Sequence, residues 1–390
     1  MKTKSSRRDF LALGLSLPIA GMASTSDFIE PSPQAALAPL RGSPVQPSYR
    51  ILGKTGLKAT TVGFGCMITS DASVIERAAD LGINYFDTAR GYQHGNNERM
   101  VGAALKRKRN DVFISSKTPS QSKQAALKDL DTSLRELGTD HLDIWYLHGK
   151  DKTGEVTDDL IEAQQSAKQE GKIRFAGVST HAPKVLIPFL VKSGAIDVVL
   201  VTYNFTMDKD MNAAIEQAAK AGMGVVAMKV MAGGFRRVKP GDPLMPKLKR
   251  EGAMLAALKW VVKNPNVHTT IPSMTDMDQL EENLKAMAEP YTPVEEKLLA
   301  RQLEYISPLY CRMCGKCAGT CAQGLPVADV LRYLTYADGY GQFSLGREAF
   351  QELPSEVVEV RCTKCPSCTV TCPFGVQVAS RLTRAQEIFA

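Results

Sequence analysis

Four ionisable side chains, Asp87, Tyr92, Lys117 and His148, lie at or just after the ends of short runs of β-branched and aromatic residues. A phenol has an unperturbed pKa of about 10, and a neighbouring lysine ammonium lowers it. A carboxylate keeps that ammonium charged, and a histidine can hydrogen-bond a substrate oxygen on which charge develops. Each residue alone could be structural, as a loop cap, a solvated lysine or a core histidine. Together they predict proton transfer to a carbonyl oxygen while hydride reaches its carbon.

Eight of the nine cysteines repeat one spacing, C-x2-C-x2-C-x3-C, near the end of the chain. The two runs are Cys311, Cys314, Cys317 and Cys321, then Cys362, Cys365, Cys368 and Cys372. This spacing resembles the [4Fe–4S] ligand run of bacterial ferredoxins, whereas zinc sites, the alternative, prefer two pairs separated by a longer loop. In two-cluster ferredoxins the fourth cysteine of each run ligates the other cluster. The resemblance therefore implies that Cys372 joins the first three cysteines and that Cys321 joins the second three.

The elements that must position these residues alternate between strands and helices. Eight strands are predicted, at 61–65, 83–87, 112–116, 142–147, 173–178, 198–203, 224–228 and 267–271. The intervening segments have helical periodicity, clearest at 125–137. Five of them end at a glycine before the next strand, at Gly82, Gly138, Gly171, Gly194 and Gly222. Repeated strand–helix units predict parallel strands closed as a (β/α)8 barrel, with chemistry at the carboxyl ends of the strands.

The alternative fold is an open doubly wound sheet, which favours G-x-G-x-x-G after the first strand, and that sequence is missing. Residues 49–57 predict a hairpin that could close the bottom of the barrel. Cys66, at the end of the first strand, is predicted to be a small buried hydrophobe rather than a nucleophile or ligand. The loops after strands one, four and seven should shape the substrate pocket, with Trp145 and Phe235 as candidate walls.

Several segments resemble the aldo/keto reductase family over residues 49–290. They are the hairpin at 49–57, NYFDTARGY at 84–92, GNNE at 95–98, ISSKT at 114–118 and IRFAGVS at 173–179. The resemblance implies that Tyr92 is the general acid/base, that Lys117 and Asp87 tune its pKa, and that His148 orients the carbonyl. It also implies a nicotinamide cofactor, NAD(P)(H), and a small carbonyl or alcohol substrate.

The cofactor positions match this family less closely. The resemblance implies contacts from Ser179, Thr180, Lys229, Gly233, Gly234, Ser273, Glu282 and Asn283. Thr180 replaces the usual asparagine, Leu200 the usual glutamine, and Met228-Lys229 the usual tyrosine-serine pair. Gly233 and Gly234 could admit a pyrophosphate or form a flexible loop. In this family a lysine and an arginine often bind the 2′-phosphate of NADP, and Ser273 and Gln279 occupy those two positions here. The sequence therefore leaves open whether the cofactor is NAD or NADP. The basic stretch 236–250 is either a substitute clamp or a solvated loop.

The chain begins with a basic head and a short apolar run that is too short to span a bilayer. Ser6-Arg7-Arg8-Asp9-Phe10-Leu11 resembles a twin-arginine export signal, with an ordinary secretory signal as the alternative. The domains expected are a signal at 1–23, a proline-rich linker at 24–48, a barrel at 49–305 and a ferredoxin-like iron–sulfur domain at 306–390. The expected location is the periplasm, reached through the twin-arginine translocase.

Composition and charge limit the class of protein and the partners that it can bind. The chain is 44% apolar and 23% charged, which excludes a disordered protein. Of its net charge of +7, the first nine residues contribute +3. No basic–aromatic pattern favours nucleic acid, and a redox partner protein is expected for the clusters. Two other functions stay open: an electron-transfer or docking protein whose barrel does not turn over, and a lyase or isomerase that uses Tyr92 without hydride.

Overall fold

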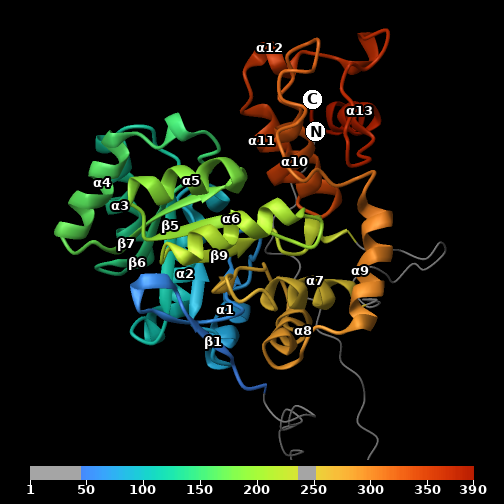
Figure 1. Ribbon diagram of the computed structural model, residues 1–390. Coiled ribbons are helices and arrows are strands. Elements are labelled where there is room, and N and C mark those ends of the chain that lie inside the picture. Colours follow the sequence, from blue (N-terminus) through green and yellow to red (C-terminus); the bar gives the residue numbers. More distant parts are fainter. Residues whose placement is uncertain (1–44, 236–251) are drawn as a thin grey trace, which may run out of the picture. The chain divides into compact units, whose positions relative to one another are not determined.

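The computed structural model describes residues 45–235 and 252–390, and residues 45–390 form one compact unit (Figure 1). The predicted export signal, most of the proline-rich linker and the whole basic stretch 236–250 lie outside the described residues. Among the helices of the described ranges, none combines the length and the apolar character needed to cross a membrane.

Within the ranges that the structure describes, eight parallel strands form the barrel in chain order. They are β3 (Phe64–Gly65), β4 (Tyr85–Asp87), β5 (Phe113–Thr118), β6 (Leu142–Leu147), β7 (Ile173–Thr180), β8 (Val198–Thr202), β9 (Gly224–Met228) and β10 (Thr269–Thr270). Parallel bridges from Val62 to Thr270 and from Gly65 to Ser273 join the first strand to the last. The ring is therefore closed, and the prediction of a barrel over an open sheet is confirmed.

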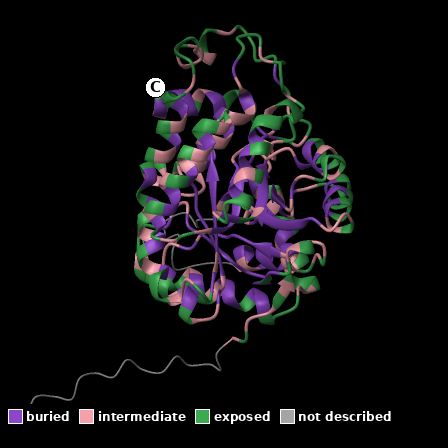
Figure 2. Cartoon of the chain, turned by 90° about the vertical axis from the view of Figure 1, so that its left-hand side faces the viewer, coloured by how far each residue is buried: buried purple, intermediate pink, exposed green. Residues whose placement is uncertain are grey.

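Eight helices of the described residues surround these strands. They are α1 (Ala72–Asp80), α2 (Asn96–Leu105), α3 (Lys123–Leu137), α4 (Asp158–Gln169), α5 (Pro183–Ser193), α6 (Lys209–Lys220), α7 (Ala253–Val262) and α8 (Met277–Ala288). The strands are almost wholly buried and the helices bury only their inner faces, as Figure 2 shows. All five glycines predicted to end helices have positive φ. That conformation costs glycine nothing because it has no Cβ.

The predicted hairpin is formed by β1 (Tyr49–Ile51) and β2 (Lys58–Thr60), which pair antiparallel. The side chains of Leu52 and Leu57, at its turn, are buried among residues that fill the barrel interior. The backbone N–H of Lys54 donates to the carbonyl of Gly222, just before β9 begins. The hairpin therefore covers the amino-terminal end of the barrel, opposite the end that carries the predicted chemistry.

Alternation along β6 decides which of its side chains face the barrel interior. Ile144 and Tyr146 belong to the interior cluster, whereas Trp145 belongs to the cluster between strands and helices. Because successive side chains of a strand point to opposite faces, Trp145 cannot line the pocket, and its prediction as a wall was wrong. Phe235 is also buried elsewhere, against Ile306.

The chain continues beyond the barrel as helices. They are α9 (Pro293–Ile306), α10 (Val327–Asp338), α11 (Phe343–Gln351), α12 (Ser355–Val358) and α13 (Val378–Phe389). Within residues 306–390 the helices share their own apolar core, which includes Leu334, Phe350 and Phe389. This region, drawn in orange to red in Figure 1, contains no strand.

Candidate active site and cysteine motifs

Three strands bring the four predicted catalytic residues to one end of the barrel. The ammonium of Lys117, in β5, lies 2.5 Å from the carboxylate of Asp87, at the end of β4, and 3.3 Å from the hydroxyl of Tyr92. His148 directly follows β6, and its ring meets the Tyr92 ring edge to face at 5.8 Å. The four side chains are therefore mutual neighbours, as the sequence predicted.

Neighbouring groups hold Asp87 and Lys117 in place. The hydroxyl of Ser115 donates to the second oxygen of Asp87 at 2.7 Å, and Lys117 also donates to the carbonyl of Thr88 at 2.7 Å. Burial alone would lower the pKa of Lys117, but the charge of Asp87 and the hydrogen bonds to Asp87 and Tyr92 outweigh it and raise that pKa. The lysine is therefore a fixed cation beneath the phenol of Tyr92.

The electrostatics of Tyr92 differ from the prediction in one respect. Burial raises its pKa to about 12, and the nearby charge of Lys117 lowers the value only in part. Lysine therefore moderates the effect of burial rather than bringing the phenol below its ordinary pKa. At neutral pH the hydroxyl is protonated, which is the state needed to donate a proton to a carbonyl oxygen.

His148 is neutral at the same pH. Burial lowers its pKa well below the ordinary value, and the cations Lys117, Arg332 and Lys229 add to the effect. A neutral imidazole has one N–H donor and one acceptor nitrogen. It can therefore hydrogen-bond a substrate oxygen while Tyr92 supplies the proton.

A cavity of about 1200 Å³ opens above these residues and reaches across the mouth of the barrel. Tyr92, His148 and Asp87 line one part of it, and Ser273 and Gln279 line another. Of the eight predicted cofactor contacts, four line the cavity: Ser179, Lys229, Gly234 and Ser273. The loops after β3, β6 and β9 also contribute, as predicted, through Met67, Asp151 and Met231.

The other four predicted cofactor positions do not line the cavity. Thr180 is buried and its hydroxyl lies 3.2 Å from Asp151, and Asn283 is buried on α8. Glu282, its neighbour on α8, likewise lies outside the lining. A Cβ on Gly233 would lie 2.9 Å from the ring of Tyr310, so this glycine is packed against the C-terminal region.

The sequence reasoning missed that the C-terminal region closes one side of this cavity. Arg332, Tyr336 and Tyr340, from α10 and the turn after it, line the cavity together with the catalytic residues. Arg332 and Tyr336 stand four residues apart, which places them on one face of α10, and that spacing was the available signal. A hydrogen bond of 3.1 Å, from the side-chain amide of Asn204 to the hydroxyl of Tyr310, also joins the barrel to the C-terminal region.

The eight C-terminal cysteines have free thiols and fall into two neighbourhoods. The pKa of Cys311 is raised mainly by burial, and the thiols that act on it are Cys317, Cys314 and Cys372. For Cys362, burial also raises the pKa, and the thiols that act on it are Cys321, Cys365 and Cys368. Each neighbourhood thus contains three cysteines of one run and the fourth of the other.

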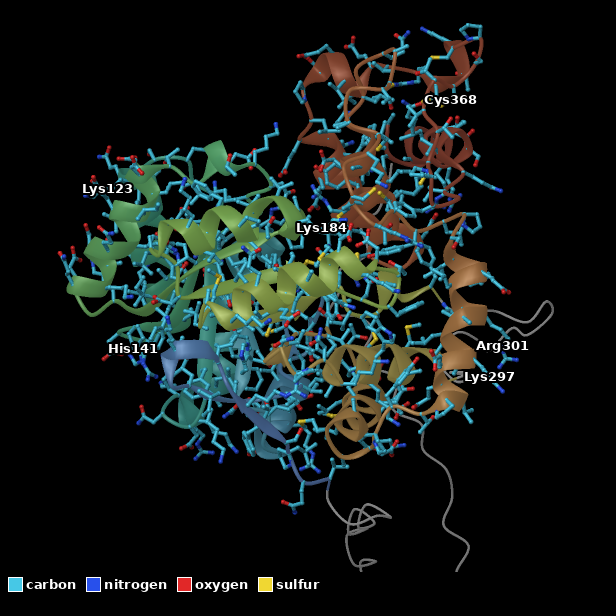
Figure 3. The ribbon with its side chains drawn as sticks, viewed as in Figure 1. Lys123, His141, Lys184, Lys297, Arg301 and Cys368 are labelled. Carbon is cyan, nitrogen blue, oxygen red and sulfur yellow. The ribbon has the colours of Figure 1, made fainter. Side chains whose placement is uncertain are left out.

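Each neighbourhood is also held by a contact between the two runs. The guanidinium of Arg312 lies 4.2 Å from the ring centre of Phe374, beside Cys372. The Thr369 hydroxyl, next to Cys368, donates to the carbonyl of Thr320 at 2.8 Å. Cys368, labelled in Figure 3, is exposed in the C-terminal region. Within the described ranges, no three His, Cys, Asp or Glu side chains are placed to hold a single metal ion.

Cys66 lies outside both neighbourhoods. It follows β3 and is completely buried in the core between strands and helices. Burial raises the pKa of its thiol far above the ordinary value. The residue is a neutral, buried thiol, which agrees with its prediction as a small hydrophobe.

Comparisons with known proteins agree with this barrel and its site. Residues 69–253 match the aldo/keto reductase family. The uncharacterized oxidoreductase YqkF of Bacillus subtilis is 28% identical over 67% of this chain and 97% of its own length. L-galactose dehydrogenase of Arabidopsis thaliana is 28% identical over 62% of this chain and 88% of its own.

Among solved structures, the holo form of the aldo-keto reductase AKR11C1 from Bacillus halodurans superimposes with a TM-score of 0.57. It is 27% identical and covers 66% of this chain and 96% of its own. The barrel over residues 69–253 is therefore of the aldo/keto reductase type, and the chain is similar to oxidoreductases of that family. The family match ends at residue 253, so the cysteine-rich region lies outside it.

Proposed function

We propose that this protein interconverts a carbonyl compound and its alcohol with NAD(P)(H), at Tyr92, and carries two [4Fe–4S] clusters that exchange electrons with a redox partner. The observation that supports the reaction best is the ion-paired Lys117 beneath the hydroxyl of Tyr92, at the wall of a large cavity. In the reduction, Tyr92 donates its proton to the carbonyl oxygen, and the neutral ring of His148 hydrogen-bonds the same oxygen.

The cavity suits a dinucleotide. Its volume exceeds the 300–1000 Å³ typical of ligand pockets, and it extends from Tyr92 to Ser273 and Gln279. NAD(P)H would supply the hydride when bound, with Ser179, Lys229 and Ser273 among its contacts. Ser273 and Gln279 carry no charge to hold the 2′-phosphate of NADP, so the choice between NAD and NADP depends on other residues.

The experiment is a titration of anaerobically purified protein with NADH and NADPH, followed by assays on a panel of aldehydes, ketones and alcohols. Saturable nucleotide binding with stoichiometric oxidation of NAD(P)H and formation of alcohol is the expected result. Absence of binding by either nucleotide would refute hydride chemistry. The apolar Leu200 and Met228 that line the cavity favour, in that case, a barrel serving as a docking scaffold. Product formed without nucleotide would indicate a lyase or isomerase.

The residues of the C-terminal region suit two clusters. The repeated spacing and the two neighbourhoods of four thiols support this. A [4Fe–4S] cluster bonds each thiolate to a different iron, so its ligands lie further apart than those of a single ion. The backbone N–H of Met313 lies 3.3 Å from the sulfur of Cys311, and that of Phe374 lies 3.4 Å from the sulfur of Cys372. Such donors stabilise thiolate ligands.

Alanine double variants should separate the crossed assignment from an uncrossed one. If Cys321 serves the second cluster, Cys321→Ala with Cys368→Ala should remove about four of roughly eight irons per chain. Cys321→Ala with Cys317→Ala should remove nearly all of them. Iron and acid-labile sulfide analysis measures both, and Cys66→Ala should retain the full content. The reverse pattern for the two double variants would contradict the crossing.

The protein is further proposed to be exported, folded and with its clusters inserted, by the twin-arginine route. This part rests on Ser6–Leu11 and on the clusters, since that route carries folded proteins. A bound nucleotide would have to travel with the protein, because the periplasm is not expected to supply it. Fractionation of cells checks the location, and recovery from the cytoplasm alone would contradict export.

A further inference from the structure

The turn that follows β9, residues 229–234 and here named the β9 turn, forms part of the cavity. Four of its residues line the cavity: Lys229, Val230, Met231 and Gly234. Lys229 and Ala232 both have a positive φ, of 57° and 46°. This region of φ is unfavourable for residues with a Cβ, and it persists only where the surrounding structure holds it. The contacts of the β9 turn therefore decide whether it keeps this shape.

Asn204, two residues after β8, holds the β9 turn from inside the barrel. Its side chain is completely buried, and its amide nitrogen donates to the carbonyl of Lys229 at 3.0 Å and to the hydroxyl of Tyr310 at 3.1 Å. Its amide oxygen accepts from the backbone N–H and the hydroxyl of Thr206, at 3.1 and 2.8 Å. Because a buried donor without an acceptor destabilises the structure that buries it, the position of Asn204 depends on both of its acceptors.

Tyr310 holds the same turn from outside the barrel. It is buried and belongs to one small apolar cluster with Ala232. A Cβ on Gly233 would lie 2.9 Å from its ring, so the ring packs directly against the backbone of the β9 turn. Tyr310 therefore contacts this turn through its ring and, by way of Asn204, through its hydroxyl.

The residue after Tyr310 is Cys311, the first cysteine of the first run. Residues 307–326, which connect α9 to α10, contain no helix or strand that would fix the position of Cys311. Met313 in this segment also has a positive φ, of 56°. Bonds from cysteine ligands to a metal centre fix a segment of this kind, because ligand binding and local folding are coupled. Ligation of Cys311 would thus also fix its neighbour Tyr310.

The β9 turn has one more contact with the C-terminal region. The backbone of Gly339, after α10, lies against the carbonyl of Gly233. This contact involves no cysteine, so it would remain if the ligands of the first run were removed. Loss of the contacts through Tyr310 should therefore loosen the β9 turn without releasing it completely.

We propose that Tyr310 and Asn204 are positioning residues that couple the first cluster, the one ligated by Cys311, to nucleotide binding in the cavity. The inference rests on the proposed clusters and nucleotide, and it adds a form of regulation to them. A ligand that contacts a turn already held in place does not have to order it, and so binds more tightly. Coupling between two sites is reciprocal. Bound nucleotide should therefore also slow the release of iron from the first cluster to a chelator.

The test is a cycle of variants titrated anaerobically with NADH and NADPH. Cys314→Ala with Cys317→Ala removes the first cluster whether or not the fourth cysteines cross, and it should raise the nucleotide Kd at least about fivefold. Tyr310→Phe removes only the hydroxyl that Asn204 needs, and it should raise Kd at least about threefold. Added to the variant without the first cluster, Tyr310→Phe should change Kd less than about 1.5-fold, because the two substitutions break the same connection. Tyr291→Phe, between α8 and α9 and outside the cavity lining, is the matched control and should leave Kd unchanged.

Amide hydrogen exchange provides a readout that needs no nucleotide. Exchange in residues 229–234 should be at least about threefold faster in Tyr310→Phe and in the variant without the first cluster. Exchange in β8 should be unchanged, which also verifies that the barrel of each variant is folded.

Two results would overturn the coupling in a protein that contains iron and binds nucleotide. One is an unchanged Kd and unchanged exchange after loss of the first cluster, and the other is full additivity of the two substitutions. If neither nucleotide binds but exchange in the β9 turn responds, the proposed reaction fails and the connection between cluster and turn stands. A wild-type protein without iron would refute the proposed clusters and the coupling together.

Discussion

Replacing Tyr92 by phenylalanine should lower kcat and kcat/KM for carbonyl reduction by about 10²–10⁴-fold, with little change in KM. The substitution removes one hydroxyl and leaves the ion pair of Lys117 and Asp87 in place. A positioned general acid contributes about this factor, and a group that acts only in the transition state changes kcat and kcat/KM together. Steady-state kinetics with saturating nucleotide measure the effect.

The pH dependence provides a second readout for Tyr92. With a pKa of about 12, the phenol is protonated from pH 6 to 10. Reduction, which needs the protonated phenol, should therefore not decrease through titration of Tyr92 over this range. Tyr85→Phe is a matched control, because its hydroxyl bonds Tyr146 at 2.9 Å inside the barrel and does not line the cavity. If Tyr92→Phe keeps more than half of the activity, another group is the acid.

Replacing Lys117 by methionine should affect both stability and activity. Asp87 would be left buried, at 1% exposure, without its cation. Breaking a buried ion pair by removing one partner costs about 3–5 kcal/mol in the free energy of unfolding. The pKa of Tyr92 would rise further, because Lys117 is the cation that lowers it. We expect kcat per folded molecule to decrease at least about 10-fold.

Two variants separate the stability effect from the catalytic one. Lys117→Met combined with Asp87→Leu removes both charges and should recover most of the stability but none of the activity. Lys259→Met breaks another buried lysine's pairs, with Glu289 after α8 and Glu295 in α9, and none of these three residues lines the cavity. It should lower the unfolding free energy without lowering kcat. Denaturant unfolding and active-site-normalised rates measure these outcomes. Wild-type kcat in Lys117→Met would exclude Lys117 from proton transfer.

The local pattern of apolar residues and glycines was sufficient to predict most strands and helices of the barrel. Parallel strands buried on both faces are apolar along nearly their whole length, as in β8 from Val198 to Val201, and glycines such as Gly138 mark helix ends. Strand ends were less certain. Lys117 was expected to follow its strand but lies within β5, because its side chain, though charged, is buried by its pairing with Asp87. An apolar pattern identifies a strand by its apolar residues, so a polar residue inside a buried strand is interpreted as the end of that strand.

The sequence by itself determined the classes of chemistry. Spacing alone identified the two cysteine runs, because the four members of each run lie close together in the chain. The order of strands brought Asp87, Tyr92, Lys117 and His148 to one end, because all strands of such a barrel run in one direction. These predictions needed only local propensity and the geometry of parallel strands.

Only the tertiary structure decided what surrounds that chemistry. The pKa of Tyr92 depends on the balance between its burial and the charge of Lys117, and burial is a property of the packed molecule. The wall formed by Arg332 and Tyr336 depends on where α10 packs, some 240 residues after Tyr92 in the chain. Contacts between segments so far apart leave no periodic trace in the sequence, because either segment could form its helix or strand without the other.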